Sequence, residues 1–268
     1  MDGLSQKWTL YFANRRSPEA IARIQRQRLD QLVDYAKNNS PFYSRIYQNI
    51  AAPIVDLRGL PVVTKPQLMD CFDQWVTDPQ ITLQDVHQFI SNQHHPTQRI
   101  VDRYSVWITS GTTGEPGIFL QDSRAQSIYN DLILFRAYPA WLNLRQLFDL
   151  VRLGFRYTLI IATGGPYAGV SSWEQVRQRL GRFRDVLSTL SIDHPMPELV
   201  RQLNEIQPVV LSSYPSMLYL LALEQLEGSL NIHPEMLAFT GEWIEPEGRR
   251  TIESAFSPGR LVELYGAS

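Results

Sequence analysis

The sequence contains a single cysteine, Cys71, among its 268 residues. One thiol excludes an intrachain disulfide framework and any zinc site built from several cysteines, and it is typical of a reducing compartment. Neither sign of charge predominates, because 25 basic and 27 acidic residues give a formal net charge of -2. That balance disfavours nucleic acid and anionic membranes as partners, since both need a surface rich in Lys and Arg.

Long apolar runs are missing as well. No stretch approaches the roughly 18 apolar residues that a membrane-spanning helix needs. The first seven residues lack the charged and then apolar layout of a signal peptide. We therefore expect a cytoplasmic protein that does not enter membranes. The 44% of apolar residues is ordinary for a packed globular core.

The first 100 residues are predicted to be helical and carry no obvious chemistry. Ser17 followed by Pro18 is a typical helix start, because serine caps the first turn and proline lacks only an N–H that would stay unpaired. Apolar residues then recur at helical spacing up to a stop at residues 38–41. Thr64 and Thr82 are predicted caps of further helices. We expect residues 1–100 to form a helical region packed on a second domain.

From about residue 104, predicted strands alternate with predicted helices. The predicted strands span residues 104–109, 117–121, 146–151, 157–162, 184–190, 208–212, 236–240 and 260–265. The predicted helices span residues 123–138, 172–180, 196–206, 215–227 and 246–256. This alternation is typical of the α/β class with a mainly parallel sheet flanked by helices. We assign residues 101–268 to such a core.

Polar residues follow several of these strands. They occur in four segments: Thr163-Gly164-Gly165-Pro166, Ser213-Tyr214-Pro215, Thr240-Gly241-Glu242 and Tyr265-Gly266-Ala267-Ser268. Ligands of parallel sheets bind beyond the carboxyl ends of the strands, so four polar segments there favour a site over ordinary turns. Four aromatic residues could line its apolar part, although core packing explains each of them equally well: Phe155, Tyr157, Tyr167 and Tyr214.

The most informative stretch is the loop from Thr109 to Gly117. It joins two strand-like runs and contains four hydroxyl residues and three glycines, namely Thr109, Ser110, Gly111, Thr112, Thr113, Gly114 and Gly117. Glycine lets backbone N–H groups approach an anion closely, and hydroxyls add hydrogen bonds to phosphate oxygens. A hairpin needs only about two to five loop residues, so this longer loop is predicted to hold phosphate. It is not a GxxxxGK[S/T] loop, because no lysine or helix follows.

The loop resembles the signature S/T-S-G-T-T-G-x-P of the adenylate-forming superfamily of acyl- and aryl-CoA synthetases. Thr109 to Pro116 fit it, while Gly117 stands where the commonest version has lysine. The phenylacetate-CoA ligase branch and its capsule-biosynthesis relatives often lack that lysine too. Two earlier segments also resemble this branch, namely Ser40-Pro41-Phe42-Tyr43 and Leu60-Pro61-Val62-Val63-Thr64-Lys65. Residues 240–242 and 265–268 resemble two further motifs of the superfamily, in the same order.

The resemblance implies that a carboxylic acid is activated with ATP and Mg²⁺ to an acyl-adenylate and then transferred to coenzyme A. Residues 109–114 would contact the phosphates. Thr112 and Ser268 would be the catalytic residues. Gly241, Glu242 and Gly266 would line the nucleotide pocket, and Tyr265 would stack on adenine. Gly164, Gly165 and Tyr214 are the candidate substrate residues. No metal ligand is assigned.

The resemblance also covers only the N-terminal part of such an enzyme. The magnesium-binding glutamate of the last motif would be residue 269, and the small C-terminal domain would follow it. We therefore expect this chain alone to be inactive, with a separate C-terminal chain as a conceivable partner. The alternative is a non-catalytic nucleotide-binding remnant or split half. A metal-dependent hydrolase using His87, His94 and His95 is weakly supported, because the histidines lack a helical HExxH spacing.

Overall fold

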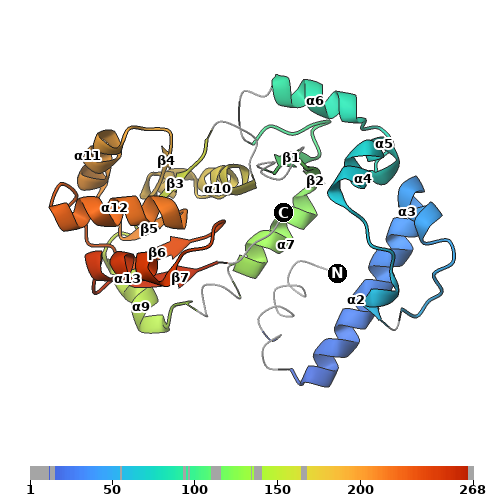
Figure 1. Cartoon of the computed structure of the whole chain (residues 1–268), viewed down its shortest axis with the longest axis horizontal. Helices are drawn as coiled ribbons and strands as arrows, with labels where there is room; N and C mark the ends of the chain where they lie inside the picture. The colour runs from blue at the N-terminus through green and yellow to red at the C-terminus, as the bar shows by residue number, and fades with distance from the viewer. Residues whose placement is uncertain are drawn as a thin grey trace. The chain divides into compact units, whose positions relative to one another are not determined.

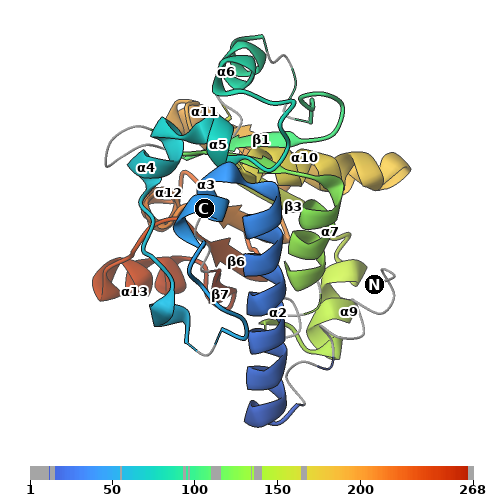
Figure 2. The same cartoon turned by 90° about the vertical axis from the view of Figure 1, so that its right-hand side faces the viewer.

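The computed structural model describes residues 12, 16–54, 56–92, 95, 97–109, 116–133, 135, 141–163 and 168–264. The chain forms two compact units, Met1–Phe135 and Arg136–Ser268. In Figures 1 and 2 the N-terminal unit runs from blue to green and the C-terminal unit from light green to red. No helix in these described ranges is both long and apolar enough to cross a membrane.

Helices dominate the beginning of the N-terminal unit, as the sequence predicts. They are α2 (Pro18–Asn39), α3 (Pro41–Ile46), η2 (Leu57–Gly59), α4 (Lys65–Asp70), α5 (Phe72–Trp75) and α6 (Leu83–Ser91). The Ser17 hydroxyl accepts a hydrogen bond from Ala20 N at 3.3 Å, which confirms the predicted start of α2. Thr82 likewise forms a reciprocal capping box with Asp85 at the start of α6.

Two strands of this unit form a hairpin of their own. The strands β1 (Ser105–Ile108) and β2 (Ile118–Gln121) pair antiparallel, with Ile108 opposite Ile118. Their buried side chains share one apolar cluster with α4, α5 and α6, namely Met69, Phe72, Ile81, Val86, Ile100, Val106 and Ile118. The expectation that these strands belong to the parallel sheet is therefore wrong. The helix α7 (Ser123–Leu132) follows the hairpin and is capped by Asp122.

The C-terminal unit contains a five-stranded parallel sheet. Its strands are β3 (Tyr157–Ile161), β4 (Leu187–Ser191), β5 (Val210–Ser213), β6 (Met236–Phe239) and β7 (Arg260–Glu263). The spatial order is β4-β3-β5-β6-β7, and each neighbouring pair is parallel. The α/β class and the parallel sheet that the sequence predicts are confirmed.

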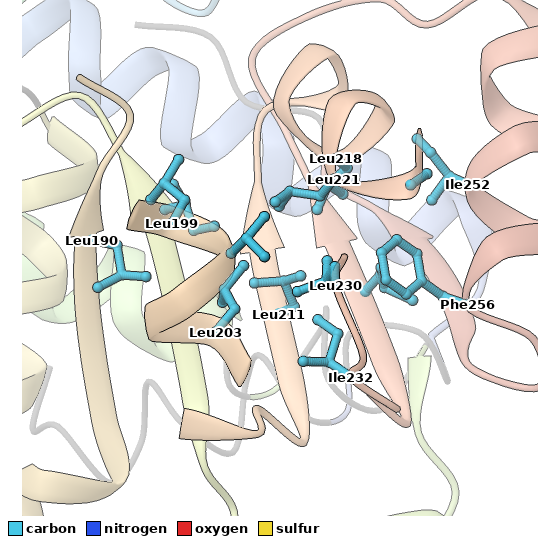
Figure 3. Packing of buried hydrophobic residues seen from close by; sticks show 14 of the residues in the cluster. Leu190, Leu199, Leu203, Leu211, Leu218, Leu221, Leu230, Ile232, Ile252 and Phe256 are labelled. Atoms are coloured by element: carbon cyan, nitrogen blue, oxygen red, sulfur yellow. The ribbon is translucent and has the colours of Figure 1, made fainter. Parts of the chain in front are cut away.

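Helices cover both faces of this sheet. The helices are α9 (Leu144–Arg152), α10 (Ala168–Arg179), α11 (Met196–Ile206), α12 (Pro215–Glu227) and α13 (Pro246–Ala255), with a 3-10 helix η4 (Gly181–Val186). Along β5, Leu211 packs in the cluster with α11, α12 and α13, which Figure 3 shows, while Val210 packs in the cluster with α9 and α10. Side chains alternate between the faces of a strand, so both faces are apolar and buried.

One predicted strand is a helix in the structure. Residues 146–151 lie in α9, where Asn143 and Gln146 form a capping box at the N-terminus. Along this segment Leu150 is buried while Phe148 and Val151 are exposed. A short apolar run does not distinguish a strand from an amphipathic helix by itself, and the capping pair decides the outcome here.

The strand order creates a switch point between β3 and β5. The chain leaves β3 towards α10 on one face of the sheet and leaves β5 towards α12 on the other face. The loops at the carboxyl ends of these two strands therefore diverge, which is the usual position of a ligand crevice in open α/β sheets. The buried Ser213 hydroxyl donates to the Ile160 carbonyl at 2.8 Å and ties the two strands together at this edge.

Two adjacent leucines of α12 provide a test of this layering. Leu221 is 0% exposed in the cluster against the sheet, whereas Leu220 is 45% exposed. We expect Leu221→Ala to lower the free energy of unfolding by about 2 to 5 kcal/mol, because it opens a cavity in the core. The matched change Leu220→Ala is expected to cost about 0.5 kcal/mol. Urea denaturation measures both values, and equal losses would contradict the assigned faces.

Candidate functional site

The carboxyl ends of β5 and β6 bring Tyr214, Gly241 and Glu242 together. Glu242 Oε2 accepts a hydrogen bond from the N–H of Ser216, in the first turn of α12, at 3.2 Å. A carboxylate is favoured there because a helix carries partial positive charge at its N-terminus. The contact fastens the loop after β6 to the helix after β5. Two predicted site segments, separate in the sequence, thus meet at one edge of the sheet.

Gly241 lies directly against the Tyr214 ring. Its φ angle is +91°, a backbone conformation that residues other than glycine rarely adopt. A Cβ atom on Gly241 would lie 3.3 Å from both Cδ1 and Cε1 of Tyr214. Two independent constraints, backbone conformation and space, therefore require glycine at this position. The absence of a Cβ atom lets the Tyr214 ring pack directly on the backbone of this loop.

A second polar group lies at the ends of β3 and β4. The Thr163 hydroxyl donates to Ser191 Oγ at 3.0 Å, and the Ser191 hydroxyl donates to Asp193 Oδ2 at 3.1 Å. Thr163 and Asp193 are both exposed. Thr163 begins a polar segment that is evident in the sequence, whereas the serine and the aspartate were not predicted. The Ser-x-Asp pattern that starts at the last residue of β4 is the signal that could have identified them.

The hydroxyl- and glycine-rich loop is described only at its base. Thr109 N donates to the Gly117 carbonyl at 3.0 Å, and Gly117 N donates to Thr109 Oγ1 at 2.8 Å. The Thr109 side chain therefore closes the base of the loop. The phosphate contacts predicted for Ser110, Gly111, Thr112, Thr113 and Gly114 lie outside the described residues and stay predictions.

The remaining predicted site residues also lie outside the described ranges. They are Gly164 and Gly165 after β3, and Tyr265, Gly266 and Ser268 after β7. The last described backbone bond beyond β7 joins Leu264 N to the Phe239 carbonyl at 2.9 Å. The chain thus leaves β7 beside the end of β6, from which the segment containing Gly241 starts.

Two of the aromatic pocket candidates belong to the core. Tyr157 is the first residue of β3, at the amino end of the strand and opposite to the carboxyl edge. Its ring packs on Trp173 with 4.6 Å between centroids, and Phe155 packs in the same cluster. Burial raises the pKa of the Tyr157 phenol, while a hydrogen bond with Ser212 opposes the rise. Tyr214 lies at the carboxyl edge of the sheet. The fourth candidate, Tyr167, lies outside the described residues.

A shallow hollow of about 320 Å³ lies between the N-termini of α12 and α13, beside Glu242. It is lined by Pro215, Ser216, Tyr219, Trp243, Ile244, Glu245, Glu247 and Gly248. Trp243 is 80% exposed. This hollow could not be predicted from a local sequence pattern, because its wall combines two helix starts that are far apart in the chain.

The described histidine contacts do not support a metal-dependent hydrolase. Nδ1 of His95 lies 2.8 Å from the Thr97 hydroxyl oxygen, and His94 falls outside the described residues. Within the described ranges, no group of three or more His, Cys, Asp or Glu side chains is arranged to hold a metal ion.

Comparison with known proteins adds structural neighbours. No protein-family model matches the chain. No curated protein matches it either. Among solved structures, a 2-hydroxyisobutyryl-CoA ligase in the postadenylation state with 2-HIB-AMP superposes with a TM-score of 0.61 at 21% identity, over 93% of this chain. The chain has the fold of part of a CoA ligase.

Two further structures of that ligase agree. The open conformation with 2-HIB-AMP and CoA gives a TM-score of 0.56 at 21% identity, over 90% of this chain and 48% of the ligase. The thioesterification state gives 0.55 at 20% identity, over 98% of this chain and 49% of the ligase. The chain therefore spans about half the length of the ligase that it resembles.

The two constraints on Gly241 can be separated by experiment. Gly228 has a φ angle of +85°, close to that of Gly241, but a Cβ on Gly228 would meet nothing within 4 Å. We expect Gly228→Ala to cost about 1 kcal/mol through backbone strain, and Gly241→Ala to cost more, up to about 3 kcal/mol, through added contact with Tyr214. Urea denaturation of both variants measures the difference. Equal losses would mean that the Tyr214 ring does not constrain this position.

Proposed function

We propose that the chain is the nucleotide-binding part of an AMP-forming acid–CoA ligase, from the phenylacetate-CoA ligase-like branch of the adenylate-forming superfamily. The observation that carries this proposal is the meeting of Tyr214, Gly241 and Glu242 at the carboxyl edge, in a fold shared with a CoA ligase. The loop motif from Thr109 to Pro116 supports it independently.

The charge of Glu242 indicates which part of a nucleotide this edge of the sheet favours. Glu242 holds a carboxylate at the start of α12, and this negative charge disfavours phosphate at that position. The same carboxylate is a good acceptor for amine or hydroxyl groups of a nucleoside. We therefore assign the nucleoside, rather than the phosphates, to the edge around Tyr214 and Glu242.

The proposed reaction is attack of a substrate carboxylate on the α-phosphate of ATP, which forms the acyl-adenylate and releases pyrophosphate. The thiol of coenzyme A then displaces AMP. A carboxylate nucleophile needs no general base, so the site needs donors for developing negative charge. We assign this role to Thr112 and Ser268, and Tyr265 to stacking on adenine. Mg²⁺, when bound with ATP, would neutralise phosphate charge.

A second candidate is a protein that binds nucleotide without turning it over. The coverage of about half of the ligase keeps this alternative open. Pyrophosphate exchange that depends on an added carboxylic acid tests this candidate, because exchange requires the adenylation step and binding does not. We expect exchange by this chain alone at the level of a buffer blank under either candidate, and exchange well above the blank would contradict a protein that only binds nucleotide.

Nucleotide binding itself is the direct test. We expect the chain to bind ATP with a dissociation constant of roughly 0.1 to 1 mM, equivalent to about 4 to 5.5 kcal/mol. The double change Ser110→Ala with Thr112→Ala is expected to weaken ATP about 10-fold and to leave adenosine unchanged, because it removes hydroxyl donors aimed at phosphate. Isothermal titration calorimetry measures both ligands.

A control and a contradicting result define this test. Ser44→Ala with Thr251→Ala removes two hydroxyls from helices α3 and α13 and is expected to change neither affinity. Equal weakening of ATP and adenosine by the loop variant would make the loop structural. No binding of ATP by the unmodified chain would contradict the proposed function.

A further inference from the structure

Two hydroxyl groups and a carboxylate form a chain of hydrogen bonds at the carboxyl ends of β3 and β4. The Thr163 hydroxyl lies 3.0 Å from Ser191 Oγ, and Ser191 Oγ lies 3.1 Å from Asp193 Oδ2. Ser191 Oγ also accepts a hydrogen bond from the backbone N–H of Asp193 at 3.2 Å. These contacts join three polar groups to which the proposed function gives no role.

The carboxylate fixes the direction of each hydrogen bond in this chain. The exposed carboxylate of Asp193 is ionised at neutral pH and can only accept, so the single proton of the Ser191 hydroxyl is donated to it. The two lone pairs of Ser191 Oγ then accept from the Asp193 N–H and from the Thr163 hydroxyl. The Thr163 proton is therefore engaged, and Thr163 Oγ1 offers a ligand lone pairs but no proton.

The pairing of β3 with β4 holds this chain in place. Ile161 is the partner of Ser191 in the parallel register of the two strands. Beyond that pair, Ile192 N donates to the Ile161 carbonyl at 3.2 Å, and His194 N donates to the Ser191 carbonyl at 3.2 Å. The Ile192 side chain packs against the apolar cluster that includes α11. The acceptor on Thr163 is thus preorganised, so a ligand does not have to order it.

The acceptor atom is accessible to a ligand. Thr163 is exposed, and within the described ranges its bond to Ser191 is the single hydrogen bond of its side chain. Asp193 is exposed as well, and its Oδ1 atom accepts no hydrogen bond from the described residues. A neutral and an ionised acceptor at one place favour a hydroxyl or amino donor on the ligand, and they disfavour a carboxylate or phosphate.

The place of Thr163 in the sheet relates it to the proposed nucleoside position. In the order β4-β3-β5-β6, the end of β3 lies next to the end of β5, at the usual spacing of about 4.8 Å between neighbouring strands. The nucleoside is assigned above to the ends of β5 and β6, around Tyr214 and Glu242. An acyl group joined to that nucleoside and directed across the switch point would lie next to Thr163.

We propose that Thr163 is a specificity-determining residue, and that the substrate is a carboxylic acid that carries a hydroxyl or amino group. This group donates to Thr163 Oγ1, while Ser191 and Asp193 are positioning residues that keep the Thr163 proton away from the ligand. An acid with an oxo group at the same place is disfavoured, because two acceptors then face each other. The inference deepens the function proposed above and rests on it.

A set of matched probes tests this inference on the full chain. The probes are non-hydrolysable acyl-sulfamoyl adenosines with a butanoyl chain, which carries a hydroxyl, amino, methyl or oxo group at carbon 2 or carbon 3. At one of these carbons we expect the hydroxyl or amino probe to bind about 5-fold more tightly than the methyl and oxo probes, because it gains one hydrogen bond. Comparison of the hydroxyl and amino probes identifies the donor. Isothermal titration calorimetry measures each affinity.

Three variants separate the acceptor from the rest of the chain of hydrogen bonds. Thr163→Val keeps the shape of the side chain but removes the oxygen, and is expected to abolish the preference. Ser191→Ala releases the Thr163 proton, so the oxo probe should gain about 5-fold while the hydroxyl probe changes less than about 2-fold. Thr189→Val is the matched control, because it removes a β4 hydroxyl that bonds to Glu174 at 3.4 Å, and should keep the preference. Thermal unfolding checks that each variant retains the fold.

Two results would overturn the inference and leave the proposed function intact. If ATP binds but the methyl probe binds as tightly as the hydroxyl and amino probes at both carbons, Thr163 selects no donor. If Thr163→Val and Thr189→Val lose the preference equally, the effect is structural. Absence of binding by ATP and by every probe is a different outcome, because it contradicts the proposed function itself.

Discussion

Parallel pairing of the five strands is the constraint on which the candidate site depends. Parallel strands place all their carboxyl ends at one edge, and the apolar layers on both faces hold the register that makes this true. A shift by one residue would turn Leu211 and Val210 to the wrong faces and disrupt both layers. The loops after β5 and β6 therefore meet at this edge.

Much of this edge could be predicted from the sequence, because local signals and a general rule coincide there. Glycine and hydroxyl residues after strand-like runs identified Tyr214, Gly241 and Glu242, and the structure brings these three together. The strand and helix alternation predicted the class of the fold for the same reason. Each such signal depends on a few neighbouring residues and on the carboxyl-edge rule.

Other features depend on contacts that a local pattern does not contain. Tyr157 looks like a pocket residue until its place at the amino end of β3 is known. The strands β1 and β2 look like part of an α/β sheet, yet their burial against α4 and α6 separates them from it.

The contact between Gly241 and Tyr214 also limits how this protein can change by mutation over time. Loss of the Tyr214 ring would give residue 241 more space but would leave its φ of +91° unsuited to a side chain. A change of backbone path would remove that demand but would also move Glu242 from the start of α12. Since no single substitution satisfies both demands, related sequences that keep this edge should retain the glycine even where the tyrosine has diverged.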